Sequence, residues 1–275
     1  MSVNKIVEVV DGFGDEWSRF DQTGLSDTEL KEMFDNYFKI FPWNSLPENS
    51  VGFDLGCGSG RWAKLVAPNV GKLYLFDPSE KALEVAKNNL QSKSNCEFYV
   101  ASVDEMPIAE ASCDFGYSLG VLHHIPDTEE GLKKCVSKLK QGSPFLLYLY
   151  YNFDNRPFWF RWIWQVSEVF RKFISRLPHS LRYYASQIAA LFIYLPLARM
   201  ALILEKIGLN VEAFPLSQYR QNSFYVMRND ALDRFGTRFE RRFTKSEMKD
   251  MMERCGLQNI LFSSTSFWTA VGYKK

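Results

Sequence analysis

Residues 51–62 read VGFDLGCGSGRW, and this stretch decides the fold. An apolar run ends in three glycines, Gly56, Gly58 and Gly60, and a helical pattern follows at once. Glycine lets the backbone turn sharply and approach a ligand closely, and the first turn of a helix offers free N–H groups. The stretch therefore predicts a buried strand, a ligand-binding loop and a helix, in that order.

Strands and helices alternate on the C-terminal side of this loop. The periodicities predict strands at 51–56, 72–77, 96–102, 113–120 and 143–152, and helices at 60–68, 79–91 and 128–140. Strands that alternate with helices are joined by crossovers and form a mostly parallel sheet that is covered on both faces. Further on, Thr244 and Glu247 form a predicted capping box before another helix, and residues 257–275 are typical of a closing strand pair.

Two other helical segments accompany this core. Residues 26–38 are amphipathic, with Ser26 and Glu29 as a capping box at their start. Residues 152–210 have helical periodicity punctuated by prolines at 157, 178 and 196, which indicates an inserted helical subdomain. We therefore predict a helical cap over 1–45, an α/β core over 46–151, the insertion over 152–210 and the rest of the core over 211–275.

Composition limits the classes of function. The 275 residues carry a net charge of +1, which gives no overall bias toward nucleic acid. The five cysteines are scattered without a C-x-x-C pair, so we expect neither a disulfide framework nor a metal site. Residues 1–17 are too rich in acids for a secretory signal, and we expect a chain that begins near Met1 and works in the cytoplasm.

The residues around the glycine loop narrow the choice of ligand. Asp77 ends the second predicted strand, about 20 residues after the loop, where a carboxylate can bind ribose hydroxyls. The glycine spacing is G-x-G-x-G, whereas dinucleotide folds prefer G-x-G-x-x-G. Asp54, two residues before Gly56, would repel a pyrophosphate but suits a ligand with an ammonium group. S-adenosylmethionine has such a group.

Four motifs occur in an order that resembles class I S-adenosylmethionine-dependent methyltransferases, in particular the small-molecule group called methyltransferase type 11. They are FDLGCGSG at 53–60, LFDPS at 75–79, VASVDEMPI at 100–108 and FGYSLGVLHHIPD at 115–127. The resemblance is close over residues 45–151 and loose in the C-terminal segment. It implies a Rossmann-like α/β fold with a mostly parallel seven-stranded sheet and a helical insertion after the fifth strand. It also implies S-adenosylmethionine as cofactor and S-adenosylhomocysteine as product.

The resemblance assigns residues to the cofactor. Asp54 would line the methionine end, where Trp17 and Phe20 would close over it, and Asp77 would bind both ribose hydroxyls. Ser102 replaces the usual aspartate that accepts from the adenine amino group, and a hydroxyl can still accept that bond. The predicted cofactor residues are Trp17, Asp54, Gly56, Cys57, Gly58, Ser59, Gly60, Asp77, Pro78, Ser79, Ser102, Val103, Leu119, Gly120, Val121 and His124.

The adjacent His123 and His124 allow three interpretations. A metal site is disfavoured, because neighbouring residues of an extended segment point to opposite sides and no cysteine or spaced histidine lies nearby. A structural role at the turn before Pro126 stays open. The resemblance implies a third role, in which the pair lines the methyl-transfer site and His124 faces the cofactor. Either histidine is then a candidate general base if the acceptor is an alcohol.

The predicted insertion is rich in aromatic and basic residues. Three tryptophans lie within 159–164, and residues 156–182 include six basic residues but only one acidic residue. The segment is either a lid that supplies the acceptor pocket or an amphipathic surface that contacts a membrane through residues 156–205. Its apolar run at 188–198 is expected to be too short to span a bilayer. The predicted acceptor pocket comprises Tyr151, Trp159, Tyr219, Arg220 and Tyr225, with arginine as a partner for an anionic group.

These patterns favour a cytoplasmic enzyme that methylates a small, partly apolar acceptor by in-line displacement, with oxygen the favoured atom and nitrogen or carbon next. A membrane-associated, lipid-like acceptor is the first alternative, and RNA or protein is a weaker one. A module that binds the cofactor and a surface without catalysis is the non-enzymatic alternative. We expect no nucleic-acid partner, and the sequence leaves the oligomeric state open.

Overall fold

The computed structural model describes residues 6–153, 156–264 and 267–275, and the chain divides into two compact units. Unit 1 takes in residues 1–22, 30–152 and 239–275, and unit 2 takes in residues 23–29 and 153–238. The sequence predicted an insertion over 152–210. Unit 2 extends further, because helix α9 (Phe224–Gly236) packs against helix α7 (His179–Ala189).

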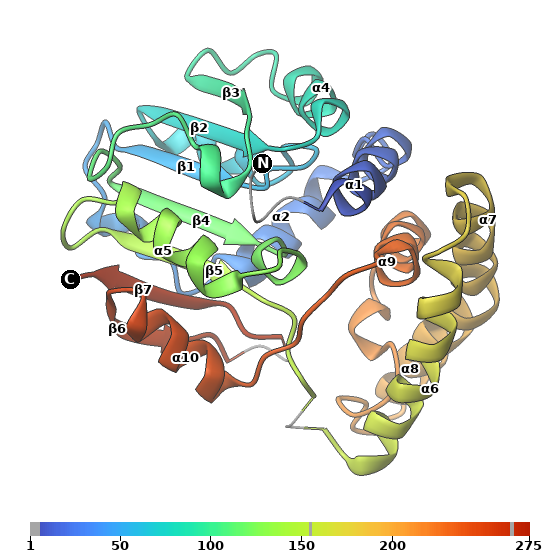
Figure 1. The fold of residues 1–275 in the computed structure, drawn as a ribbon. Coiled ribbons are helices and arrows are strands. Elements are labelled where there is room, and N and C mark those ends of the chain that lie inside the picture. The colour runs from blue at the N-terminus through green and yellow to red at the C-terminus, as the bar shows by residue number, and fades with distance from the viewer. Residues whose placement is uncertain (1–5, 154–155, 265–266) are drawn as a thin grey trace. The chain divides into compact units, whose positions relative to one another are not determined.

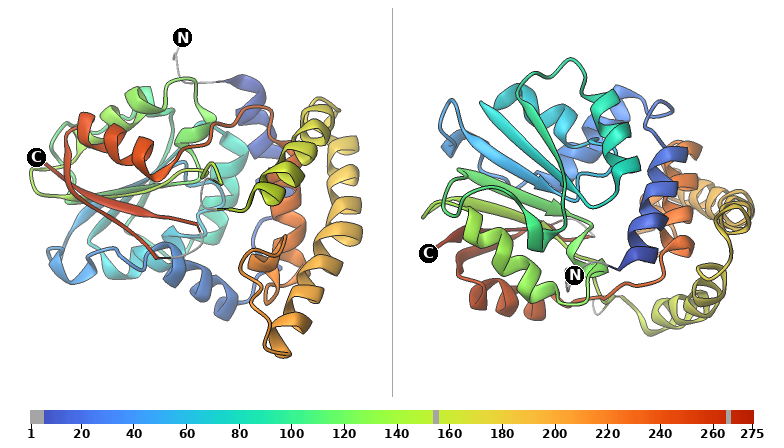
Figure 2. Two further views of the ribbon diagram at one scale, coloured as in Figure 1. Left: turned by 90° about the horizontal axis from the view of Figure 1, so that it is seen from below. Right: turned by 45° about the horizontal axis from the view of Figure 1, so that its top comes forward.

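Unit 1 is built on a seven-stranded sheet flanked by helices on both faces (Figures 1 and 2). Its strands are β1 (Val51–Leu55), β2 (Lys72–Asp77), β3 (Cys96–Val100), β4 (Phe115–Leu119), β5 (Pro144–Tyr148), β6 (Leu257–Phe262) and β7 (Ala270–Lys274). They lie in the order β3-β2-β1-β4-β5-β7-β6, with β1 to β5 parallel and β7 antiparallel to both neighbours. The predicted Rossmann-like fold is confirmed. Its connections reverse direction between β1 and β4, and open parallel sheets bind ligands at the carboxyl edge beside such a point.

Helices hold this edge in place from both sides of the sheet. Unit 1 contains α1 (Val7–Arg19), most of α2 (Asp27–Tyr37), α3 (Ala63–Val66), α4 (Glu80–Asn89), α5 (Thr128–Lys138) and α10 (Lys245–Arg254). On one face, α5 and α10 share a buried apolar cluster with Phe53 and Phe145 of the sheet. From the segment after α2, Phe38 packs its ring 5.2 Å from that of Tyr117 in β4. The strands that carry the site are therefore buried on both faces, as their apolar sequences predict.

The helix starts differ in how well the sequence predicts them. The capping box of Thr244 and Glu247 is confirmed at the start of α10. At the start of α2, Ser26 accepts from the Glu29 backbone N–H at 3.2 Å, but the Glu29 carboxylate instead accepts from the Ser223 N–H at 2.7 Å. Helix α1 lies within the predicted helical cap over 1–45, but its bounds were not predicted, because it contains Gly12 and Gly14 and has no capping side chain.

The longer part of unit 2 is mostly helical. It contains α6 (Phe158–Ile174), α7, a π-helical turn η5 (Ala190–Tyr194), α8 (Leu195–Lys206) and α9. The sequence predicted a break at Pro196, yet α7, η5 and α8 form one continuous helix from His179 to Lys206. The wider π turn directly before Pro196 accommodates the missing N–H. Among the described residues, this 28-residue helix is the one whose length and composition would suffice to cross a membrane.

Candidate functional site

The glycine loop after β1 is held by the acid at the end of β2. Gly56, Gly58 and Gly60 have φ values of +74°, +53° and +73°, a region that favours glycine. The Gly58 N–H donates to Asp77 Oδ2 at 3.0 Å, and the Ser79 N–H donates to Asp77 Oδ1 at 2.9 Å. A carboxylate oxygen can accept more than one hydrogen bond, so Asp77 keeps capacity for two ribose hydroxyls.

Asp54 is a buried carboxyl group for which burial outweighs the favourable charge of Arg61. Its side chain is 2% exposed, and within the described residues its Oδ2 has no hydrogen-bond partner. Burial, reinforced by the charge of Asp77, raises the pKa of Asp54 to about 8, and burial raises the pKa of Asp77 to about 6. An unsatisfied buried carboxylate is costly, and a bound ammonium group would relieve that cost. The site therefore fits the methionine end of S-adenosylmethionine.

The residues after β4 leave room next to this loop. Gly120 has a φ of +81°, and an added Cβ there would meet no atom within 4 Å. An added Cβ on Gly56 would instead touch the Val121 side chain at 2.3 Å. Leu119 is buried at the end of β4. The predicted wall of Leu119, Gly120 and Val121 thus adjoins open space on one side and the glycine loop on the other.

The other predicted loop residues lie in the glycine loop or next to Asp77. Cys57 and Ser59 are buried in the loop, and the Ser59 hydroxyl has no partner within the described residues. Pro78 is half-buried between Asp77 and Ser79, and the Ser79 hydroxyl caps α4 by accepting from the Ala82 N–H. An orphaned buried hydroxyl is a further polar group that a ligand could satisfy.

Helix α1 covers the glycine loop. An added Cβ on Gly58 would lie 2.7 Å from Nε1 of Trp17, and one on Gly14 would lie 2.6 Å from the Ser79 hydroxyl. Phe13 packs its ring 4.9 Å from that of His124, and Phe20, at the end of α1, is fully buried. The predicted covering residue Trp17 thus lies directly over the loop. The whole helix takes part, through glycines that permit close packing.

The part of the site where the adenine of the cofactor is expected contains a carboxylate that was not predicted from the sequence. The Ser102 hydroxyl donates to Oε2 of Glu105 at 2.9 Å across the 3₁₀ turn η3 (Val103–Glu105), where Val103 is buried. Glu105 thereby brings an acid to the side of the serine that replaces the usual aspartate. The S-x-x-E spacing, which places two side chains on one side of a turn, was the available signal.

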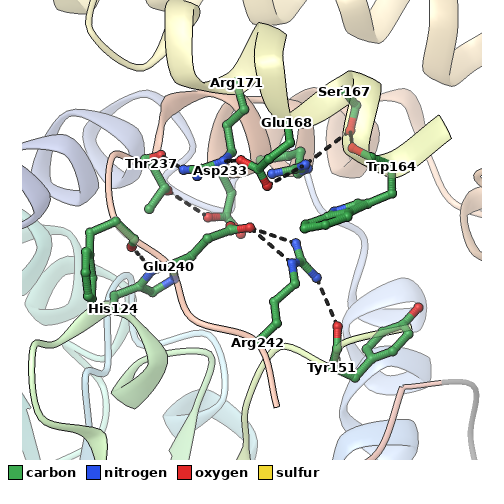
Figure 3. A network of polar contacts seen from close by, with 12 residues as sticks. His124, Tyr151, Trp164, Ser167, Glu168, Arg171, Asp233, Thr237, Glu240 and Arg242 are labelled. Atoms are coloured by element: carbon green, nitrogen blue, oxygen red, sulfur yellow. Dashed lines mark hydrogen bonds and ion pairs between the residues drawn. The ribbon is translucent and has the colours of Figure 1, made fainter. Parts of the chain in front are cut away.

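The histidine pair lies in the 3₁₀ turn η4 (Leu122–His124) and binds the segment 239–243. Figure 3 shows His124 beside Glu240 of this segment. The His124 Nδ1 lies 2.8 Å from the Phe239 carbonyl oxygen, and the His123 carbonyl accepts from the Arg241 N–H at 2.9 Å. Next to them, the Phe243 N–H donates to the Tyr150 carbonyl at 2.8 Å. The pair is therefore part of the corner that fastens this segment to the core.

His123 is fully buried, and within the described residues neither ring nitrogen has a hydrogen-bond partner. Burial, followed by the charges of His124 and Arg242, lowers the pKa of His123 well below its usual value. A neutral imidazole is suited to accept a proton, but a ring without exposed surface offers no contact to an acceptor. The geometry thus differs from the predicted role of His123 in catalysis, while His124, 4% exposed, packs on α1.

A cluster of four aromatic side chains, which the sequence did not predict, lies at the carboxyl edge of β5. The Tyr37 ring lies 4.9 Å from Trp62, 5.1 Å from Tyr148 and 4.9 Å from Phe267. We call Tyr37, Trp62, Tyr148 and Phe267 the aromatic edge. The Gly120 N–H donates to the Tyr148 carbonyl at 3.1 Å, which places this edge next to the open space at Gly120. Its members come from four separate segments, so no local pattern could reveal it.

The five residues predicted for the acceptor pocket are divided between the two units. Tyr151 is buried in unit 1, with its ring 5.3 Å from Trp268. In unit 2, Arg220 forms two bonds to the Glu205 carboxylate, at 2.8 and 2.7 Å, and the Tyr219 hydroxyl donates to Asp230.

The other two predicted pocket residues, Trp159 and Tyr225, also belong to unit 2. Trp159 is exposed and Tyr225 packs against Gly24. The structure does not bring the five together within one unit. Since Glu205 already neutralises Arg220, the predicted partner for an anionic group is occupied.

Comparisons with known proteins agree with this geometry. Residues 53–147 match the family described as a methyltransferase domain. The tRNA U34 carboxymethyltransferase of Campylobacter jejuni is 29% identical over 60% of this chain and 54% of its own length. The ubiquinone biosynthesis O-methyltransferase of Coxiella burnetii is 26% identical over 38% and 44%, respectively. The chain thus matches about half the length of these relatives.

Solved structures share the fold. An S-adenosylmethionine-dependent methyltransferase from Thermotoga maritima has a TM-score of 0.52 and 14% identity, over 96% of this chain and all of that one. An O-methyltransferase family protein from Burkholderia thailandensis has a TM-score of 0.53 and 12% identity, over 97% and 59%, respectively. Together with the glycine loop, Asp54 and Asp77, these matches show that residues 53–147 resemble a methyltransferase domain and that the chain has the fold of S-adenosylmethionine-dependent methyltransferases.

Proposed function

We propose that the protein transfers the methyl group of S-adenosylmethionine to a small, partly apolar acceptor, with oxygen as the favoured atom. The observation that carries this proposal is the aromatic edge beside the open space at Gly120, at the carboxyl edge of the sheet. Binding sites for small apolar molecules are lined mainly by aromatic and aliphatic side chains with a few polar groups. The hydroxyls of Tyr37 and Tyr148 supply such polar groups.

The side chains of the site act mainly by positioning. The cofactor, when bound, supplies a methyl group on a positively charged sulfur. Asp54 holds the ammonium end, Asp77 holds the ribose, and the glycine loop lets the backbone approach. The aromatic edge excludes water and presents ring faces that favour a cation. In-line transfer needs no further group from the protein when the acceptor atom carries a negative charge.

Oxygen is favoured because a carboxylate, or the phenolate of an unusually acidic phenol, supplies such a charge at neutral pH without a general base. The buried, unreachable ring of His123 gives no accessible base to an alcohol. The name of the Coxiella burnetii relative, an O-methyltransferase, supports the same choice.

RNA is the competing acceptor class, because two relatives are named for reactions on tRNA. Binding of RNA relies on basic surfaces, and the net charge of this chain is +1. We therefore propose the small molecule over RNA.

The test uses the purified full chain with S-adenosylmethionine labelled on its methyl group. Three acceptor pools are offered separately: small phenols and carboxylic acids, a lipid extract, and total tRNA. We expect label in the first pool, with Asp77→Ala as the inactive control. Label in tRNA alone, or in no pool despite cofactor binding by calorimetry, would overturn the proposed acceptor class.

A further inference from the structure

Unit 2 exposes an unusual amount of apolar surface. Apart from Val7, Val100 and Leu261, every large apolar side chain exposed among the described residues lies between positions 158 and 209. Monomeric soluble proteins rarely expose contiguous apolar patches of more than a few hundred Å², and larger ones mark interaction sites. This surface needs a partner that buries apolar side chains.

The exposed side chains follow helical stripes. On α6 they recur every three or four positions: Phe158, Trp162, Val166, Val169 and Phe173. On the long helix they are Leu181, Tyr184, Ile188, Phe192, Met200, Ile203 and Ile207. We call these two sets the outer stripes. A stripe with this spacing lies along one side of a helix, so each helix offers a continuous apolar band.

The opposite side of the long helix is occupied by protein. Ala189, Ala190, Tyr194 and Ala198 form a buried cluster with Met227, Ala231 and Phe235 of α9. Arg182 also points inward and donates to the Gly236 carbonyl at 2.8 Å. One side of the long helix is therefore covered by protein, and the side that carries the exposed apolar residues is the one available to a partner. A helix covered along one side suits the surface of a bilayer, although its length would also permit a crossing.

The charged side chains that are exposed between positions 156 and 207 are positive. Arg161, Lys172, Arg176 and Lys206 are exposed to solvent. The only acids between positions 156 and 207 are Glu168 and Glu205. Glu168 is paired with Arg171 (Figure 3) and with Arg234, and Glu205 is paired with Arg220. The exposed cations therefore face solvent beside the outer stripes without a neighbouring exposed acid on these helices.

We propose that the outer stripes bind the surface of an anionic lipid bilayer, with the helices lying in the plane of the interface. Apolar stripes flanked by lysine and arginine are typical of helices that embed at the boundary between headgroups and acyl chains. Trp159 and Trp162 have the amphipathic ring that is enriched at this depth. The basic residues supply the attraction to anionic headgroups. This inference does not depend on the nature of the methyl acceptor.

The test is flotation of the full chain with vesicles of phosphatidylcholine, with and without phosphatidylglycerol. We expect flotation with the anionic vesicles and its reversal at high salt, because electrostatic attraction contributes to interfacial binding. The double variant Trp162→Glu and Phe192→Glu should lower the floated fraction at least about fivefold, since it charges both stripes. The matched control is Leu261→Glu, an equally exposed apolar residue of β6, which should float like the native chain.

Independent readouts keep the result interpretable. Cofactor affinity measured by calorimetry should be unchanged in the double variant, which shows that unit 1 is folded and separates this inference from the proposed function. Sedimentation should show that the variant and the native chain have the same mass. Absence of flotation, equal flotation of the double variant, or a native oligomer that the double variant dissociates would overturn the proposal. The last result would assign the stripes to a second copy of this chain.

Discussion

The rings of His123 and Tyr150 pack against each other with their centroids 3.9 Å apart and their planes tilted by 32°, and the histidine ring is fully buried. This relationship indicates that the imidazole acts as a flat packing surface. We therefore expect His123→Phe to keep methyl transfer and its pH profile, and to change the free energy of unfolding by less than about 1.5 kcal/mol.

The comparison variant for this test is His124→Phe, which removes the contact to the Phe239 carbonyl. Its expected cost is about 1–3 kcal/mol in chemical denaturation, because a buried carbonyl loses its partner. A large fall in kcat for His123→Phe at unchanged cofactor affinity, with loss of one limb of the pH profile, would instead show general-base catalysis.

Cofactor affinity should depend on pH through Asp54. Its pKa is raised to about 8 by burial, so the group is protonated at neutral pH in the free protein. An ammonium group binds the carboxylate form, and binding below pH 8 therefore releases a proton. We expect the affinity to rise toward pH 8, by at most about tenfold per pH unit, and we expect Asp54→Asn to bind weakly without this slope. Calorimetry between pH 6 and 9 measures both.

The same shift predicts how stability changes with pH. The folded state holds the Asp54 proton more tightly than the unfolded state, whose pKa lies near 3.8. The resulting stabilisation is complete below that value and is lost as the pH rises through about 8. Asp54→Asn should therefore raise the free energy of unfolding of the cofactor-free protein at pH 8 by at least about 1 kcal/mol. A destabilised variant at pH 8 would contradict a carboxyl group whose ionisation is opposed by burial.

The space beside Gly120 can be filled selectively. Gly120→Ala and Gly142→Ala each place a methyl group in open space at a positive φ, of +81° and +78° respectively. Both should lose a similar stability of about 1–2 kcal/mol, since the backbone strain is the same. Only Gly120→Ala should reduce methyl transfer or cofactor affinity, because Gly142 lies in the turn before β5. Equal activity of the two variants would show that the space at Gly120 is unused.

The carboxylate of Glu105 should matter for recognition of adenine. We expect Glu105→Gln to weaken binding of S-adenosylhomocysteine but to leave binding of its inosine analogue, which lacks the amino group, almost unchanged. The matched control is Glu110→Gln, an exposed acid of the following loop. If both ligands lose affinity equally, the role of Glu105 is to hold the turn at Val103.

The sequence predicts the parts of this protein that are encoded locally. The glycine loop, Asp77 and the alternation of strands and helices are short patterns with a fixed geometry, and they predict the sheet and the cofactor edge. The aromatic edge was not predictable, because Tyr37, Trp62, Tyr148 and Phe267 meet only after the chain has folded. The bounds of helix α1 could not be predicted, because its glycines have a low helix propensity. The same glycines permit close packing of the helix on the loop.

Arg220 shows a second limit of the sequence. An arginine in a polar stretch suggests a partner for an anion, and only the folded unit reveals that Glu205 already occupies it. Pro196 shows a third limit of prediction from sequence, because whether it breaks the helix depends on whether the preceding turn can widen.

The hydrogen bonds of segment 239–243 determine where the chain can accept an inserted or replaced segment. Tyr151 and Phe243 form a β-bridge, so the two points at which the chain leaves and re-enters the core are fastened side by side. Insertion of a new segment at such a junction leaves the sheet and the cofactor edge intact, because the ends of the segment are already joined by hydrogen bonds. Unit 1 thereby keeps the sheet and the cofactor edge, and residues 153–238 form a segment that can be exchanged without changing them. Replacement of residues 153–238 by another segment would therefore leave the residues of the cofactor edge in place.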